Sequence, residues 1–171
     1  MKRYGPILFG IAIVGISAFF WNSTMNGHAR GTLIRIGQPR DGRLELTEAE
    51  WKAKLPSDAF RVARQSGTER AFTGATWDTK GEGVYHCVCC GQPLFDSGTK
   101  FDSGTGWPSF WKPADEEAVS LFGDGGRVEV TCSRCDAHLG HVFEDGPRPT
   151  GLRYCMNSAA MDFAPKDGTA K

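Results

Sequence analysis

Apolar and polar positions divide the chain into an N-terminal apolar run, a polar segment and a longer region of short apolar stretches. The run extends from Tyr4 to Trp21 and contains no Asp, Glu, Lys or Arg. As a helix, its 18 residues would span about 27 Å, close to the bilayer's hydrocarbon thickness of about 30 Å. Lys2 and Arg3 precede the run, and its last residue is an aromatic of the kind found at membrane interfaces. The pattern predicts a membrane helix over residues 1–22.

A cleavable signal peptide is the alternative interpretation, and it requires a small-x-small site soon after the apolar core. The residues there are mostly bulky, and the triplet Gly27-His28-Ala29 lies late, so an uncleaved anchor is favoured. The basic residues before the run indicate a cytoplasmic N-terminus, although Arg30 and Arg35 on the far side count against it. Residues 23–43 form a polar tether. We expect a membrane-anchored protein whose globular domain is exported to the periplasm or another extracytoplasmic space.

Two short helices are predicted at the start of a globular domain that covers residues 44–165. Thr47 and Glu50 have the spacing of a capping box, which opens a helix over residues 48–52 before a proline ends it. A second helix is expected over residues 58–65.

Short apolar stretches follow the helices, separated by turns rich in Gly, Asp and Ser. They predict strands at residues 84–87, 93–95, 119–122, 128–131, 141–143 and 152–154. Strands at this spacing favour a mainly β fold of small antiparallel sheets, with the two helices at its start. Residues 166–171 are small and polar and predict a flexible tail.

Charge and composition narrow the function classes. The chain has 20 basic and 20 acidic residues, and this lack of net charge argues against a nucleic-acid partner. Hydrophobic residues make up 40% of the chain, enough to bury a core. Its 22 glycines are nearly twice the average share of about 7%, as expected of a turn-rich domain. The six cysteines are the other departure from average, and most of the chemistry depends on them.

Four cysteines form two C-x-x-C pairs, Cys87 with Cys90 and Cys132 with Cys135. Two residues between thiolates let one turn present both sulfurs to an ion, and two such turns complete a tetrahedral zinc site. Four protein ligands leave no open position, so the predicted role is structural. Disulfide bonding is the alternative, because an exported domain meets an oxidising compartment. Cys87 and Cys89 could instead supply the first two ligands, but this alternative is less favoured.

Cys155 has no partner at metal-ligand spacing and lies in a polar stretch. In a strand, Arg153, Cys155 and Asn157 would share one face, and the nearby cation would stabilise the thiolate and lower the pKa of Cys155. His138 and His141 follow the second C-x-x-C pair and are suited to acid–base chemistry at neutral pH. The residues alone leave two interpretations open: a nucleophilic cysteine, or a small apolar side chain buried on a strand.

Several longer motifs resemble one known family. The runs KFDSGTGWPSFW, HLGHVFEDGP, RYCMNS and RQSGTERAFTG, together with the two cysteine pairs, are similar to the B-type methionine sulfoxide reductases. The resemblance covers roughly residues 46–163 and leaves out the anchor and tether. It implies reduction of the R epimer of methionine sulfoxide, one of two epimer-specific repair activities. It also implies two small antiparallel sheets and a structural zinc held by four cysteines.

The resemblance assigns roles residue by residue. Cys155 matches the nucleophile that attacks the sulfoxide sulfur and becomes a sulfenic acid. His138 and His141 match the acid and the water-organising histidine, and Trp107 matches the indole that packs on the substrate methyl group. Three further residues match positions that hold the substrate and tune the thiolate: Asn157, Arg153 and Asp145. Asn157 is grouped with the catalytic residues, and the other two with the substrate-binding residues.

The sequence departs from the common family pattern at Thr105, where many members carry a resolving cysteine. Cys89 is the one thiol without an assigned role, so it is a candidate for that step, although it lies inside a predicted zinc turn. Reduction by an external thiol, thioredoxin-like or glutathione-like, is the other candidate. We favour this one-cysteine mechanism.

The implied partners are proteins with oxidised methionine and a thiol reductant, and the chain is expected to act as a monomer. Two function classes other than sulfoxide reduction explain fewer of these residues. A zinc-binding interaction module without catalysis leaves Cys155, Trp107 and the paired histidines unexplained. A general thiol oxidoreductase or peroxidase would need no indole for a methyl group.

Overall fold

A computed structural model of the chain describes residues 42–166. Between these residues, no helix is both long and apolar enough to cross a membrane. The predicted membrane helix over residues 1–22 lies outside the described residues, as do most of the tether and of the tail.

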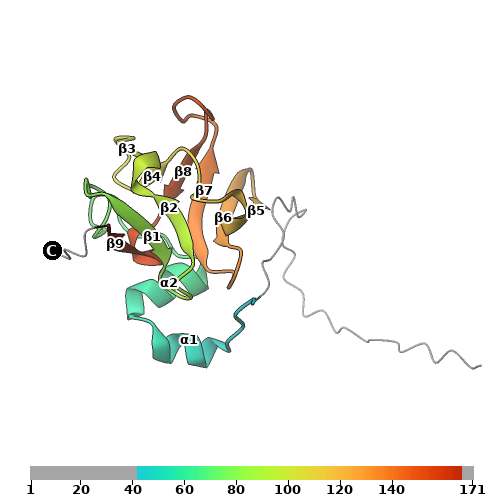
Figure 1. Ribbon diagram of the computed structural model, residues 1–171. Helices are drawn as coiled ribbons and strands as arrows, with labels where there is room; N and C mark the ends of the chain where they lie inside the picture. The colour runs from blue at the N-terminus through green and yellow to red at the C-terminus, as the bar shows by residue number, and fades with distance from the viewer. Residues whose placement is uncertain (1–41, 167–171) are drawn as a thin grey trace, which may run out of the picture.

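Two helices precede the sheets and lie together at one end of the domain (Figure 1). They are α1 (Glu48–Lys54) and α2 (Ser57–Gln65), and both were predicted from the sequence. The capping box is confirmed, because the Thr47 side chain accepts from the backbone of Glu50 and the Glu50 carboxylate accepts from the backbone of Thr47. Trp51 of α1 is buried, and α2 packs against strand β7 (His138–Phe143) and the short helix η3 (Ser158–Ala160).

The strands of the described region form two antiparallel sheets, so the mainly β prediction is confirmed. The smaller sheet has the order β2 (Pro93–Asp96), β1 (Gly83–Cys87) and β9 (Met161–Pro165). The larger has the order β3 (Lys100–Phe101), β4 (Ser109–Phe110), β8 (Arg153–Met156), β7 (His138–Phe143), β6 (Arg127–Cys132) and β5 (Val119–Asp124). Three single turns of 3-10 helix complete the elements: η1 (Ser97–Thr99), η2 (Glu116–Ala118) and η3 (Ser158–Ala160).

All six predicted strands are present, and three further strands were missed. β3 and β4 have two residues each, too few to show an alternating pattern, and they exist as strands because β4 pairs with β8. β9 ends in a proline and pairs only with β1, at the edge of the smaller sheet. Its sequence signal is weak because a proline is unusual within a sheet.

Buried aromatic side chains join the two sheets. The rings of Phe95 on β2 and Phe110 on β4 are stacked, with centroids 4.4 Å apart. Tyr85 on β1 meets Phe110 edge-on at 4.9 Å, and Tyr154 on β8 lies 5.8 Å from Phe95. Such pairs contribute about 0.5–1.5 kcal/mol each beyond their buried area. The contacts hold β8 and β4 against the smaller sheet.

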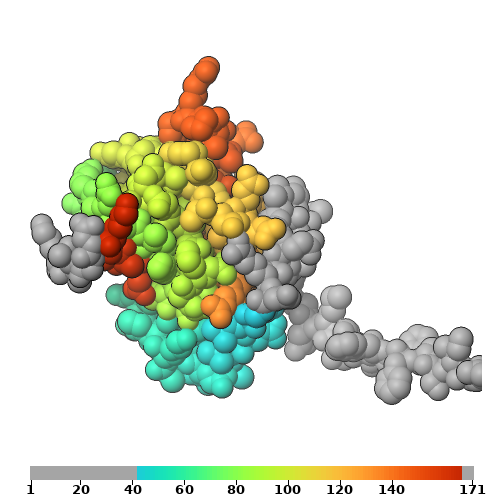
Figure 2. Space-filling model, viewed as in Figure 1, coloured from blue at the N-terminus to red at the C-terminus, as the bar shows by residue number. Residues whose placement is uncertain are grey.

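The segment between β7 and β8 stands out from the body of the molecule, away from α1 and α2 (Figure 2). It contains Asp145, which turns back to the side chain of Arg153 on β8 through two hydrogen bonds.

Candidate functional site

A row of four side chains crosses the larger sheet. Cys155 on β8 pairs with Ser109 on β4 on one side and with His141 on β7 on the other. His141 pairs in turn with Glu129 on β6. Directly opposed residues of antiparallel strands project from the same face, so the four side chains line one surface. We call Ser109, Cys155, His141 and Glu129 the transverse row.

A β-bulge in β7 explains how both predicted histidines reach this surface. Between Gly140 and His138, β7 advances two residues while β6 advances one, so Leu139 is the extra residue. In a regular strand, residues three apart would project from opposite faces. With the bulge, the rings of His138 and His141 meet edge-on with centroids 5.5 Å apart.

Gly140 on β7 lies against the backbone of β8. A Cβ atom at this position would lie 2.1 Å from the carbonyl oxygen of Cys155. Only glycine therefore allows the pairing that places His141 opposite Cys155.

Each histidine has a carboxylate partner that the sequence analysis did not identify. His138 Nδ1 lies 2.7 Å from Glu129 Oε1, and His141 Nε2 lies 3.0 Å from Asp124 Oδ2. Burial lowers the pKa of His141, and the hydrogen bond with Asp124 opposes this effect, while the nearby Arg127 and His138 act in the same direction as burial. His141 is therefore neutral at neutral pH.

Hydroxyl groups surround the sulfur of Cys155. Thr105 Oγ1 lies 4.0 Å from Cys155 Sγ. Ser103 Oγ links Thr105 Oγ1 at 2.8 Å to Ser109 Oγ at 2.7 Å, so three hydroxyls form a chain that ends at the sulfur. Thr105, at the position where many members of the resembled family carry a resolving cysteine, thus lies beside the Cys155 sulfur.

Burial raises the pKa of the Cys155 thiol, and the Arg153 guanidinium and the neighbouring hydroxyls offset only part of the rise. The sequence alone predicts that the nearby cation lowers the pKa of Cys155. Arg153 does act in that direction, but removal of the sulfur from water is the larger effect.

Arg153 is held rigidly beside this sulfur. Its Nε and terminal nitrogen donate to the two carboxylate oxygens of Asp145 at 2.8 and 2.9 Å. Its guanidinium also stacks on the Phe143 ring, 4.5 Å from the ring centroid. The hydrogen bonds with Arg153 lower the pKa of Asp145, so the pair is ionised at neutral pH.

Trp107 and Asn157 are joined through Glu69, another residue that the sequence analysis missed. The indole Nε1 of Trp107 donates to the Glu69 carbonyl at 3.2 Å. Asn157 Oδ1 accepts from the Glu69 backbone N–H, and Asn157 Nδ2 donates to the Leu139 carbonyl, both at 3.0 Å. The Glu69 carboxylate accepts from the first two N–H groups of η3 at 2.7 and 2.8 Å. Asn157 thus follows β8 and connects the bulge of β7 to the loop that positions Trp107.

The missed residues carry weak local signals. Asp124 lies in a glycine-rich turn sequence, and Glu129 alternates with two valines as any solvated strand residue does. Glu69 lies in the stretch RQSGTERAFTG, which the resemblance covered without assigning a role. Their functions depend on partners far along the chain.

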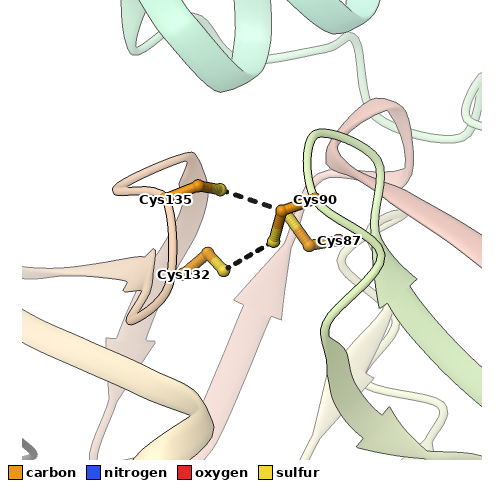
Figure 3. A group of neighbouring side chains, drawn as sticks. All are labelled: Cys87, Cys90, Cys132 and Cys135. Atoms are coloured by element: carbon orange, nitrogen blue, oxygen red, sulfur yellow. Dashed lines mark hydrogen bonds between the residues drawn. The ribbon is translucent and has the colours of Figure 1, made fainter. Parts of the chain in front are cut away.

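The two C-x-x-C pairs meet in space (Figure 3). Cys87 Sγ lies 3.7 Å from Cys135 Sγ, and Cys90 Sγ lies 3.6 Å from Cys132 Sγ. All four sulfurs lie within 4.8 Å of one another. Four thiolates that bind an ion at about 2.3 Å are separated by roughly 3.8 Å, so the cluster can bind a metal ion tetrahedrally. All six cysteines are free, which leaves the disulfide alternative without support.

Buried polar contacts hold the two cysteine turns together. Gln92 is buried, and its side-chain amide donates to the Ala118 carbonyl at 2.7 Å and to Ser133 Oγ at 3.0 Å. The Gln92 carbonyl accepts from the Cys87 N–H at 2.8 Å. The turn after β1 and the turn after β6 are therefore fixed relative to each other.

Cys89 belongs to the surroundings of this cluster. Only 1% of its surface is exposed, and the groups that act on its thiol include Cys87 and Cys135. Within residues 42–166, the groups that act on the thiol of Cys155 are a different set, led by Arg153 and Thr105.

Comparison with known proteins identifies similar chains. Residues 55–165 match the SelR domain family. A protein of Synechococcus sp. (strain RCC307) named peptide methionine sulfoxide reductase MsrB is 55% identical over 130 residues, which cover 74% of this chain and 96% of that protein. A protein of the same name from Hahella chejuensis (strain KCTC 2396) is 54% identical over 133 residues, covering 75% and 96%. The chloroplastic peptide methionine sulfoxide reductase B1 of Oryza sativa subsp. japonica is 57% identical over 120 residues, covering 68% and 56%.

We predict that Cys155 ionises at higher pH than an ordinary cysteine, whose pKa is about 8.5. Burial favours the neutral thiol, as the direction of its pKa shift indicates. The measurement is the rate of iodoacetamide alkylation of Cys155 against pH, followed by mass spectrometry of its peptide. Arg153→Gln removes the cation and should raise the inflection further, whereas Arg153→Lys keeps the charge and serves as the control. An inflection below that of ordinary cysteine would contradict the prediction.

Proposed function

Because the chain belongs to the SelR domain family, we propose that it is a peptide-methionine (R)-S-oxide reductase, an oxidoreductase that acts on a sulfur group. It reduces the R-sulfoxide of methionine residues in proteins to methionine and forms a sulfenic acid on Cys155. The observation that carries the proposal is the transverse row, in which Cys155 pairs across neighbouring strands with His141, whose imidazole is neutral. A zinc-binding module without catalysis would need no such arrangement.

The reaction balances without consuming a proton. The Cys155 sulfur attacks the sulfoxide sulfur, the oxygen is transferred from methionine to Cys155, and methionine leaves. The methionine sulfur gains two electrons, and the cysteine sulfur loses two. The thiol loses one proton and the sulfenic acid carries one proton, so the number of protons does not change. The site therefore requires a group that accepts a proton from sulfur and supplies one to oxygen, and imidazole does both.

The protein side chains around Cys155 supply these functions. His141 lies opposite the thiol and is neutral, so it is suited to accept the thiol proton. His138 supplies a second imidazole on the same surface. The guanidinium of Arg153 attracts the developing thiolate. The hydroxyl of Thr105 lies within reach of the same sulfur, and both it and the guanidinium stabilise negative charge there.

The substrate is held by an apolar surface and polar positioning groups. Trp107 presents its indole to the substrate methyl group, and its contact with Glu69 fixes the ring. Asp145 holds Arg153 in place, and Asn157 connects the bulge of β7 to the Trp107 loop.

Zinc is the metal ion that Cys87, Cys90, Cys132 and Cys135 would hold. Four sulfur ligands are typical of structural zinc, which would have no open coordination position and would supply no step of the reaction. Its contribution is to join the turn after β1 to the turn after β6.

An external thiol regenerates Cys155. The position at which a resolving cysteine would lie beside the sulfur is occupied by Thr105. Cys89 is buried among the metal ligands, which argues against its attack on the sulfenic acid. Reduction of the sulfenic acid by an external thiol, thioredoxin-like or glutathione-like, is the mechanism that these two placements favour.

Residues 1–22 anchor the protein in the membrane, with the catalytic domain exported to the periplasm or another extracytoplasmic space. The support is the uncharged apolar run and the basic residues before it. Membrane fractionation and a C-terminal reporter that is active only after export test the proposal. A soluble protein, or a reporter active only in the cytoplasm, would overturn it.

The reaction is tested with separated R and S epimers of methionine sulfoxide and dithiothreitol. We expect turnover of the R epimer alone and its complete loss in Cys155→Ser, because serine cannot form the sulfenic acid. Methionine formation is measured by chromatography, with folding of the variant checked by circular dichroism. Reduction of the S epimer, or an active Cys155→Ser protein, would show that the proposed reaction or nucleophile is wrong.

Cys89→Ser should retain multiple turnover with thioredoxin, because Cys89 takes no part in regeneration. Without reductant, dimedone should label Cys155 after a single turnover, as detected by mass spectrometry. A disulfide between Cys89 and Cys155, or loss of all turnover beyond the first, would instead identify Cys89 as the resolving thiol.

Loss of a zinc ligand should destabilise the domain strongly. Cys132→Ser should contain less than one zinc per chain and lose about 4 kcal/mol or more of unfolding free energy, as expected where a structural metal is lost. Zinc is measured by elemental mass spectrometry and stability by denaturant titration. Cys89→Ser is the matched control and should keep one zinc per chain. An undiminished zinc content in Cys132→Ser would exclude the four-cysteine site.

A further inference from the structure

Glu129 and His138 form a hydrogen-bonded pair, and Glu129 has no role in the reaction proposed above. Glu129 Oε1 lies 2.7 Å from His138 Nδ1, and the side chains are 24% and 5% exposed. The other ring nitrogen, Nε2, is buried and has no hydrogen-bond partner in the described part of the chain. We propose that Glu129 is a positioning residue that holds the His138 proton on Nδ1, so that Nε2 exchanges a proton with the sulfoxide oxygen. This inference rests on the proposed function.

The chemistry of the two groups determines the tautomer. An ionised carboxylate only accepts hydrogen bonds, and a neutral imidazole donates from one nitrogen and accepts at the other. Nδ1 therefore carries the proton that points at Glu129, and the lone pair of Nε2 remains free. A buried polar atom without a hydrogen-bond partner destabilises the folded state. Such an atom beside the transverse row is explained if a substrate group or proton completes its hydrogen bonding.

His141 provides an internal contrast. It is bound through the opposite nitrogen, Nε2, to Asp124. The Asp124 carboxylate is 45% exposed and also accepts from Arg127 at 2.7 Å, so a competing cation shares it. Glu129 is less exposed, and in residues 42–166 no cationic side chain other than His138 forms an ion pair with it. The two histidines are thus held in opposite tautomers. The Glu129 carboxylate, which is less exposed and not shared with Arg127, holds its histidine more firmly than Asp124 does.

The hydrogen bond with Glu129 also stabilises the form of His138 that donates a proton to the sulfoxide oxygen. When Nε2 of His138 takes up a proton, the ring becomes an imidazolium in a buried site, and the negative charge of Glu129 offsets that charge. Donation from Nε2 to the oxygen returns the ring to its neutral form with the Nδ1 proton unmoved. Among the described residues, the ring of His141 contacts the His138 ring, and the charged and titratable groups around His141 are Asp124, Arg127 and Cys155.

Nitrogen-15 NMR of the active wild-type chain tests the tautomer without any substitution. At a pH where His138 is neutral, we expect the shifts of a protonated Nδ1 and an unprotonated Nε2 at His138, and the reverse at His141. A protonated Nε2 at neutral His138 would overturn the proposal while leaving the R-sulfoxide reductase activity established. Absence of that activity would instead overturn the proposed function.

Substitution of Glu129 tests the effect on the reaction. Glu129→Gln keeps the size but removes the charge, and its amide can donate to Nδ1 and force the wrong tautomer. We expect kcat to fall about 10²- to 10⁴-fold, the range of general acid–base catalysis, with a small change in KM. Glu129→Asp retains the charge and should recover part of kcat. The control Glu82→Gln alters an exposed residue with a 3.6 Å ion pair to Lys166 and should leave kcat unchanged.

A double substitution separates this role from a purely structural one. If Glu129 acts through His138, Glu129→Gln should cause no further loss of kcat in a His138→Gln background. Additive losses, or a wild-type kcat in folded Glu129→Gln, would overturn the proposal. Should Glu129→Gln fail to fold, the NMR assignment of the wild-type tautomer still decides the matter.

Discussion

The pairing of β7 with β8 is the contact on which the site depends. It places His141 opposite Cys155, and it is possible only because Gly140 has no side chain to strike the Cys155 carbonyl. The bulge beside that glycine then turns His138 to the same surface. Two histidines and a cysteine from different strands become neighbours through backbone geometry, before any side-chain interaction among them is considered.

Burial governs the chemistry of this surface. It raises the pKa of the Cys155 thiol and lowers the pKa of His141, so both groups are neutral where an exposed pair would be partly charged. A neutral thiol facing a neutral imidazole can pass a proton without first separating charge in a poorly solvated site. The fixed charges nearby, chiefly the Arg153–Asp145 pair, then stabilise the thiolate as it forms.

The supports of the site come from distant parts of the fold. Glu69 ties the loop after α2 to η3 and, through its backbone, to both Trp107 and Asn157. The stacked Phe95 and Phe110 rings join the sheets, and the cysteine cluster links their ends on the other side. The cysteine cluster, which can bind a metal ion, and Cys155 therefore lie among different neighbouring groups.

The sequence by itself determined the features that are local or repeated: both helices with the Thr47 capping box, six of the strands, the two C-x-x-C pairs and the motifs around Cys155. Periodicity and spacing depend on neighbouring residues, so one chain displays them. Only the tertiary structure decided the two-residue strands, the direction of the Cys155 pKa shift and the contacts of Glu69, Asp124 and Glu129. These depend on desolvation and on partners brought together across strands, and neither quantity is encoded in the spacing of residues along the chain.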